Sequence, residues 1–197
     1  MTARAAFEDA LEAVKAWHAA LPELHQFCPW PQDLTYAERR PNPLPAMELL
    51  HSNPGTNTAL SAPVLQAYQS IAPYLEWRHT YTAEEVGQHF LDTFAWFELA
   101  GPDGHFITCE TRITAAYWGP GLLYDRHQHV AEELYTVISG EALFMSDGDP
   151  DETLGAGATR YHASNQPHAL ITQNHPLVVL VFWRGEGLAD APALTPS

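Results

Sequence analysis

The sequence predicts a mainly β protein, a small sandwich or barrel that carries an N-terminal helical extension. Three observations support this fold class. Apolar residues recur at helical spacing over residues 3–21, the period changes to two after His105, and several short strands with turn signals between them follow. We expect residues 1–100 to form the helical segment, residues 101–190 the barrel, and residues 191–197 a tail.

The first predicted helix covers residues 3–21 and presents one apolar face to a core. Its apolar positions are Phe7, Leu11, Val14, Trp17 and Leu21. Pro22 ends or kinks this helix. Five prolines in residues 27–45 then predict an irregular connector, because each removes a backbone donor and fixes φ.

Three further helices are expected before the barrel. A short one covers residues 46–50, and a second starts at Ser61 with proline in its first turn and is stopped or bent at Pro73. The capping-box pair Thr82 and Glu85 precedes a third helix. Its apolar positions are Val86, Phe90, Phe94 and Phe97, and it would end near residue 100.

From His105 onward the alternation predicts strands. The apolar positions Ile107, Cys109, Ile113 and Tyr117 alternate with Thr108, Glu110, Arg112 and Thr114. Ser139 and Gly140 indicate a hairpin between two short strands, residues 147–152 an acidic solvated turn, and residues 177–183 another apolar strand.

The charge balance narrows the classes of partner. Nine Lys and Arg residues against 24 Asp and Glu residues give a formal net charge of −15. Such a surface repels phosphate backbones and anionic lipids, so we expect neither nucleic acid nor membranes as partners. The same field modestly favours a small cationic or zwitterionic substrate.

A cytoplasmic location is expected for three reasons. Glu8, Asp9 and Glu12 interrupt any signal-like apolar run near the N-terminus, and no apolar run of about 18 residues exists elsewhere. Cys28 and Cys109 match no CxxC pattern, so a disulfide framework is not indicated.

A candidate metal site lies between Gly121 and Gly140. Alternation along an extended chain places His127 and His129 on one face, and Glu133 shares a face with Tyr135. Imidazole nitrogens with a carboxylate suit one divalent transition-metal ion: Fe(II), Mn(II), Ni(II) or Zn(II). His168, downstream of a glycine-bearing turn, would be the last ligand, while His127 either binds the ion or supports the ligands.

Aromatic residues accompany these ligands. Tyr135 is a candidate general base or a further ligand, because a nearby divalent cation favours the phenolate, although a core aromatic would show the same spacing. Tyr124 has the opposite parity to His127 and reaches the site only if the chain between them bulges. Trp183 ends an apolar stripe or forms a cavity wall. The spacing of Tyr161 and His162 does not separate lining from packing.

The same residues resemble a known family, the cupins, whose fold is a double-stranded β-helix barrel. The first cupin motif is matched by Gly121, His127, His129, Glu133 and Gly140. The second is matched in part: Gly157 and His168 fit, whereas Ala163, Asn165 and Thr172 stand at its proline, glycine and asparagine.

A narrower resemblance rests on His129, Glu133 and Tyr135 together with Tyr124, His168 and Trp183. This set is similar to the cupin-type dimethylsulfoniopropionate (DMSP) lyases of the DddQ type. The resemblance implies a carbon–sulfur lyase that releases dimethyl sulfide and acrylate. Tyr135 would then be the base and Tyr124 its helper, with Trp183, Tyr124 and Tyr161 beside the substrate.

The residues leave other functions open. The same ligands could serve another cupin enzyme, such as an Fe(II) dioxygenase or an isomerase, or a non-catalytic cupin that binds a small molecule. A DNA-binding regulator is disfavoured by the acidic balance. The helical segment would either cover one mouth of the barrel or mediate a homodimer.

Overall fold

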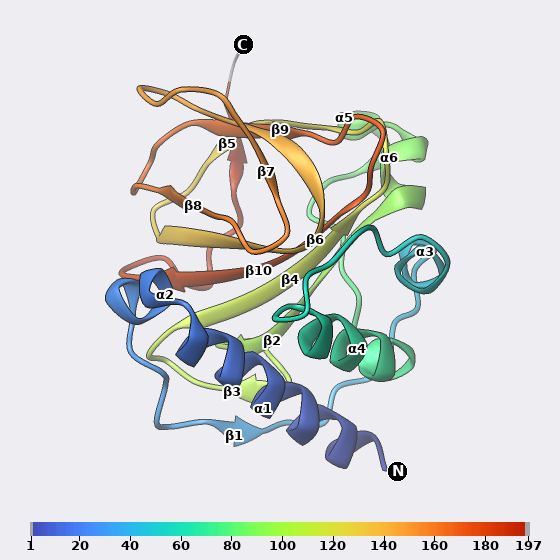
Figure 1. Cartoon of the computed structure of the whole chain (residues 1–197), viewed down its shortest axis with the longest axis vertical. Coiled ribbons are helices and arrows are strands. Elements are labelled where there is room, and N and C mark those ends of the chain that lie inside the picture. The colour runs from blue at the N-terminus through green and yellow to red at the C-terminus, as the bar shows by residue number, and fades with distance from the viewer. Residues whose placement is uncertain (1, 196–197) are drawn as a thin grey trace.

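The computed structural model describes residues 2–195. Its strands form two sheets that share the long strand β6, and its N-terminal helices lie together beside one of them (Figure 1). The predicted fold, a mainly β cupin barrel with an N-terminal helical extension, is confirmed.

The elements follow one another in two groups. The helices are α1 (Ala3–Ala20), α2 (Pro22–Phe27), α3 (Ala46–Ser52), α4 (Ala62–Ile71), the 3-10 turn η1 (Ala72–Tyr74), α5 (Ala83–Val86) and α6 (Gln88–Thr93). The strands are β1 (Thr35–Tyr36), β2 (Phe94–Gly101), β3 (Phe106–Ile107), β4 (Arg112–Trp118), β5 (Leu123–Gln128), β6 (Glu132–Ser146), β7 (Glu152–Gly155), β8 (Thr159–His162), β9 (His168–Ile171), β10 (Leu177–Arg184) and β11 (Ala193–Leu194).

Strand β6 belongs to both sheets. Its first half pairs with β10 and β8, and β10 continues through β4, β2 and β3 to β1. Its second half pairs with β7 and β9, and β9 continues through β5 to β11. The barrel interior therefore lies between two sheets that a single strand connects.

Alternation along the first sheet produces two separate cores. One face packs against α1, α2, α3 and α4, and its strand residues include Phe97, Ala115, Tyr117, Leu134, Ile138, Leu180 and Phe182. The other face lines the barrel, with Phe94, Ala116, Trp118, Tyr135, Val137, Val179 and Val181. The sheet thus separates the helical extension from the barrel interior.

The predicted helix that would run to Phe97 is wrong. Thr82 donates its backbone N–H to Glu85 as the capping box requires, but α5 ends at Val86, and α6 ends at Thr93. Gly87 has φ of +81°, which interrupts the helical path. Phe94 and Phe97 lie on opposite faces of strand β2, so the helical part of the chain ends seven residues earlier than expected.

The predicted hairpin at Ser139 and Gly140 is also wrong, because β6 runs on without reversing. Gly140 has φ of +74°, and a Cβ added there would lie 1.7 Å from the carbonyl oxygen of Pro176. A residue without a side chain is needed at this point, where β6 leaves one sheet and enters the other. The glycine signal was real, but it marks a bend within one strand.

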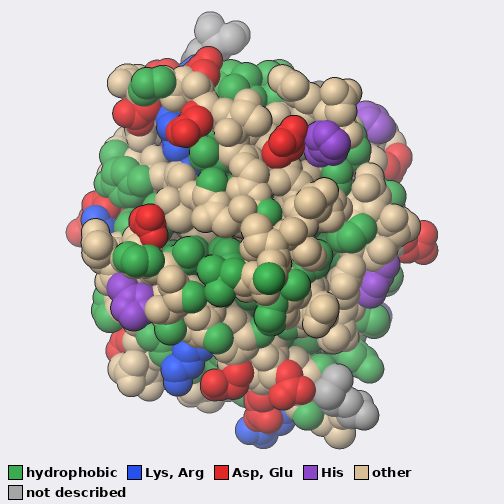
Figure 2. Space-filling view, viewed as in Figure 1, with side chains coloured by type: hydrophobic (Ala, Val, Ile, Leu, Met, Phe, Trp, Pro, Cys, Tyr) green, Lys and Arg blue, Asp and Glu red, His purple; other side chains and the backbone are tan. Residues whose placement is uncertain are grey.

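The visible surface carries many more acidic than basic side chains (Figure 2). This distribution follows the excess of Asp and Glu in the sequence. Among residues 2–195, no helix combines the length and the apolar character needed to cross a lipid bilayer.

Candidate metal centre and cavity

Strand register brings the candidate ligands to one end of the barrel. His127 near the end of β5 lies directly opposite His168 at the start of β9. Glu133 in β6 lies directly opposite His162 in β8, and His129 occupies the turn between β5 and β6. Directly opposed residues share a face of a sheet, so the members of each pair point the same way. All five side chains are buried and lie close together inside the barrel.

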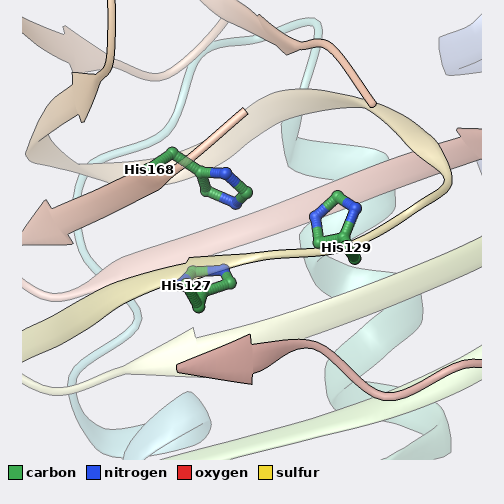
Figure 3. Close-up of side chains that lie close together, drawn as sticks. All are labelled: His127, His129 and His168. Carbon is green, nitrogen blue, oxygen red and sulfur yellow. The ribbon is translucent and has the colours of Figure 1, made fainter. Parts of the chain in front are cut away.

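Backbone carbonyls set the tautomer of the three histidines drawn in Figure 3. Each Nδ1 lies 2.7–2.8 Å from the carbonyl oxygen of a residue two positions away: Asp125 for His127, Ala131 for His129 and Gln166 for His168. A carbonyl only accepts, so each Nδ1 carries the proton. Each Nε2 therefore presents a lone pair, which is the form in which imidazole binds a metal.

The Glu133 carboxylate lies among these lone pairs. Its Oε1 is 2.9 Å from Nε2 of His168 and 3.3 Å from Nε2 of His129. With both Nδ1 atoms protonated, these are contacts between acceptors, and they are unfavourable unless a proton or a metal ion lies between the two atoms. Nε2 of His129, Nε2 of His168 and Oε2 of Glu133 are buried without a hydrogen-bond partner, so the donor set fits a divalent metal ion.

Burial keeps two of the other imidazoles neutral. It lowers the pKa of His127 to about 3 and that of His162 to about 4. The candidate ligand atoms of His127, His129 and His168 lie within 4.8 Å of one another, and so do those of Glu133, His162 and His168. His127 is thus near enough to bind the same ion.

His162 is the residue that the sequence did not assign. Its Nδ1 donates to Oε1 of Glu133 at 2.8 Å, its Nε2 is buried without a partner, and its ring stacks on His168 with centroids 3.9 Å apart. Strand parity could have narrowed the choice, because adjacent residues in a strand point to opposite faces. His162 and its neighbour Tyr161 therefore cannot both face the barrel interior. Tyr161 accordingly lies outside, 44% exposed, with its hydroxyl on Glu132; its predicted position beside the substrate is wrong.

Two tyrosines border the cluster. Between Tyr124 and His127 the pairing of β5 with β9 shifts by one residue, which is the bulge that the parity of Tyr124 required. The Tyr124 ring therefore lies 4.3 Å from the His127 ring, centroid to centroid. Burial, followed by the Glu133 carboxylate, holds the pKa of Tyr135 well above its ordinary value.

A cavity opens beside the cluster. Its lining comprises Thr80, Phe94, Trp96, Arg112, Thr114, Ala116, Trp118, Tyr124, His127, Tyr135, Val181, Trp183 and Pro192. Trp183 is thus a cavity wall as well as the end of an apolar stripe. Its ring centroid lies 4.4 Å from that of His129, and its indole N–H donates to Thr114 at 3.0 Å.

Comparisons with known proteins agree on one relationship. A family model described as dimethylsulfoniopropionate lyase matches residues 31–179. The chain is 37% identical over 190 residues to dimethylsulfoniopropionate lyase DddQ of Ruegeria pomeroyi, an alignment that covers 96% of this chain and 94% of that one.

Solved structures similar to this chain are also DMSP lyases. The crystal structure of the DMSP lyase DddQ from Ruegeria pomeroyi superposes with a TM-score of 0.90 at 36% identity and covers 96% of both chains. A chain from the crystal structures of the DMSP lyases RdDddP and RnDddQII superposes with a TM-score of 0.97 at 49% identity, covering 99% of this chain and all of that one.

Proposed function

The chain belongs to the dimethylsulfoniopropionate lyase family, and from this premise we propose that it is a metal-dependent carbon–sulfur lyase acting on DMSP. The products would be dimethyl sulfide and acrylate. One observation carries the proposal beyond family membership. The buried cluster of His129, Glu133 and His168, with unpartnered atoms facing one another, lies beside a cavity into which Tyr135 projects.

The reaction needs one strong base. Removal of a proton from the carbon next to the substrate carboxylate leaves an electron pair that forms the C=C bond of acrylate. The C–S bond breaks, its electrons leave with sulfur, and neutral dimethyl sulfide departs without an acid because the sulfonium is already cationic. The site therefore has to place one base beside the acidic C–H and exclude water.

Tyr135 is the residue proposed as that base. Its partner in the sheet is Val181, so its ring projects between the ligand cluster and the apolar floor of the cavity. With burial and Glu133 both raising its pKa, the phenolate needs nearby positive charge. A divalent ion held by His127, His129, Glu133 and His168 would favour the phenolate and withdraw charge from the substrate.

Tyr124 and Trp183 would complete the pocket. Tyr124 is buried at the far side of His127 and would orient the substrate. Trp183 closes the cavity next to His129. A pocket with these groups suits a small zwitterionic substrate such as DMSP.

Gas chromatography of dimethyl sulfide tests the proposal. Purified protein incubated with DMSP should release dimethyl sulfide and acrylate in equal amounts. Tyr135→Phe should lower the rate by roughly 10²–10⁴-fold, the usual contribution of a positioned base, while metal content and melting temperature stay unchanged. Equal rates for the wild type and Tyr135→Phe would contradict the proposed base, and no dimethyl sulfide from either would contradict the proposed substrate.

A further inference from the structure

Arg112 is a buried cation on the cavity wall that the elimination chemistry does not use. It lies at the start of β4, is 8% exposed and lines the cavity. Its guanidinium carbon lies 5.2 Å from the ring centroid of Trp96 and 5.5 Å from that of Trp183. The guanidinium is therefore packed against two indoles that also border the cavity.

Neighbouring groups hold this guanidinium in place. Its Nε donates to Oε2 of Glu98 at 2.9 Å, and its Nη1 lies 3.4 Å from the carbonyl oxygen of Asp190. Glu98 is itself fixed by the backbone N–H of Asp103 and by Arg78, whose Nη1 is 3.6 Å away. Among residues 2–195, no group accepts from Nη2 of Arg112 within hydrogen-bond distance, so this donor remains available to a ligand.

Charged groups lie at one end of the cavity, whereas the other end is aromatic and uncharged. Along β4 the cavity-lining residues are Arg112, Thr114, Ala116 and Trp118, in that order. Arg112 lies opposite Trp183, which lies opposite Glu133, so the charged groups share one row across the sheet. Trp118 lies opposite Phe94, and the Tyr124 ring lies 5.6 Å from Trp118 and 5.7 Å from Phe94.

We propose that Arg112 is a substrate-positioning residue that orients the zwitterion, attracting its carboxylate and repelling its sulfonium. The sulfonium then lies toward the aromatic wall formed by Phe94, Trp118 and Tyr124. This inference rests on the proposed function, whose substrate carries both charges.

Two physical effects favour this orientation. A carboxylate gains charge-assisted hydrogen bonds from a guanidinium that is already fixed, and a sulfonium beside the same guanidinium would face a like charge in a poorly solvated cavity. Trp183 is poorly suited to hold the sulfonium by cation–π attraction, because the Arg112 guanidinium already lies over its ring. The aromatic wall has no cation packed on it among the described residues.

Binding of two half-ligands tests the orientation without turnover. Propionate carries the carboxylate alone and trimethylsulfonium the cation alone, and isothermal titration calorimetry on the metal-loaded protein measures each. Arg112→Gln should weaken propionate binding by about tenfold or more, the usual range for a lost charge-assisted hydrogen bond, and leave trimethylsulfonium binding equal or tighter. Arg112→Lys, which keeps the charge, should restore much of the propionate affinity.

The aromatic wall provides the opposite control. Trp118→Leu, or Phe94→Leu if the former does not fold, should weaken trimethylsulfonium and leave propionate unchanged. Equal weakening of both half-ligands by Arg112→Gln, or no weakening of propionate, would overturn the proposal. Arg112 would then serve only to link Glu98 to the backbone carbonyl of Asp190. Half-ligand binding that behaves as expected in a protein releasing no dimethyl sulfide would refute the proposed function alone.

Discussion

Glu133 is fully buried, yet its charged form is favoured when positive charge lies among the imidazoles around it. Burial by itself would raise its pKa, but protons on the Nε2 atoms of His129 and His168, together with the hydrogen bond from His162, hold the pKa well below its usual value, and a metal ion would take the place of those protons. A carboxylate in this state is ready to bind a cation. The hydrogen bond from His162 on β8 fixes the orientation of this carboxylate.

Substitution of His162 should weaken metal binding. His162→Phe fills the space but removes the donor to Glu133, and we expect metal affinity to fall roughly 10–100-fold, as for other partners of metal ligands. His162→Gln keeps an N–H donor and should retain more affinity. Competition with a chromogenic chelator measures both variants, and wild-type affinity in His162→Phe would contradict the positioning role.

His105 illustrates a buried residue whose protonation should control stability. Its ring stacks on Phe7 with centroids 4.1 Å apart, and its Nε2 accepts the backbone N–H of Glu76 at 3.4 Å. Burial lowers the pKa to about 4 from 6.5 in the unfolded chain. The folded protein therefore holds the neutral ring, whose Nδ1 is buried without a partner.

This difference predicts a pH dependence. Between pH 6.5 and 4 the unfolded chain binds a proton at His105 that the folded protein does not, so the stabilisation is complete above pH 6.5 and is lost as pH falls toward 4. The total is about 3 kcal/mol. Urea unfolding of wild type and His105→Phe measures it. The free energy of unfolding of the wild type, relative to that of the variant, should fall by this amount as pH falls from 6.5 to 4. A relative stability that does not change with pH would contradict the assignment.

At the scale of elements, β6 determines how the site is assembled. Its first half carries Glu133 and Tyr135, and its second half pairs with β9, which begins with His168. The bend at Gly140 lets one strand serve both sheets, so ligands from opposite sheets approach the same point. The bulge in β5 adds Tyr124 to the same interior.

Gly140→Ala should destabilise the protein far more than an equivalent change elsewhere. A methyl group would meet the Pro176 carbonyl at a backbone with φ of +74°, so the two sheets cannot keep their junction. Gly148→Ala is the matched control, because φ is +88° there and nothing lies within 4 Å; it should cost about 1–2 kcal/mol. Thermal unfolding compares them, and similar shifts in melting temperature would contradict a special role for Gly140.

At the scale of the whole molecule, the cluster ties strands that are distant in sequence. His127, Glu133, His162 and His168 come from four strands, two in each sheet. An ion held by His127, His129, Glu133 and His168 would bind the folded protein and stabilise it by mass action. Metal occupancy should therefore affect the stability of the entire barrel.

Metal removal should lower the melting temperature. At an ion concentration of about 100 times Kd the stabilisation is about 2.7 kcal/mol, which corresponds to roughly 5–10 °C for a chain of this size. Scanning calorimetry with and without EDTA, followed by addition of Zn(II), Mn(II), Ni(II) or Fe(II), measures the effect. His168→Ala should respond weakly to EDTA, and a wild type indifferent to chelation would contradict a structural contribution from the metal.

Much of the site could be read from local spacing. The alternation of side chains placed His127 with His129 and Glu133 with Tyr135, and it stated the condition for Tyr124, which the β5 bulge meets. The same rule left Trp183 undecided between core and cavity. Arg112 appeared as one of several polar residues alternating with apolar ones, because spacing cannot show that a polar face is turned toward a cavity.

What the sequence determined by itself was the fold class, the change from helical to strand period, and the short motif that presents the ligands. These depend on contacts between residues near in the chain. The tertiary structure decided that Phe94 begins a strand, that Gly140 bends β6 instead of reversing it, and that His162 and Arg112 face inward while Tyr161 does not. Those outcomes depend on which strands pair and in what register, and pairing energies come from partners far away in sequence.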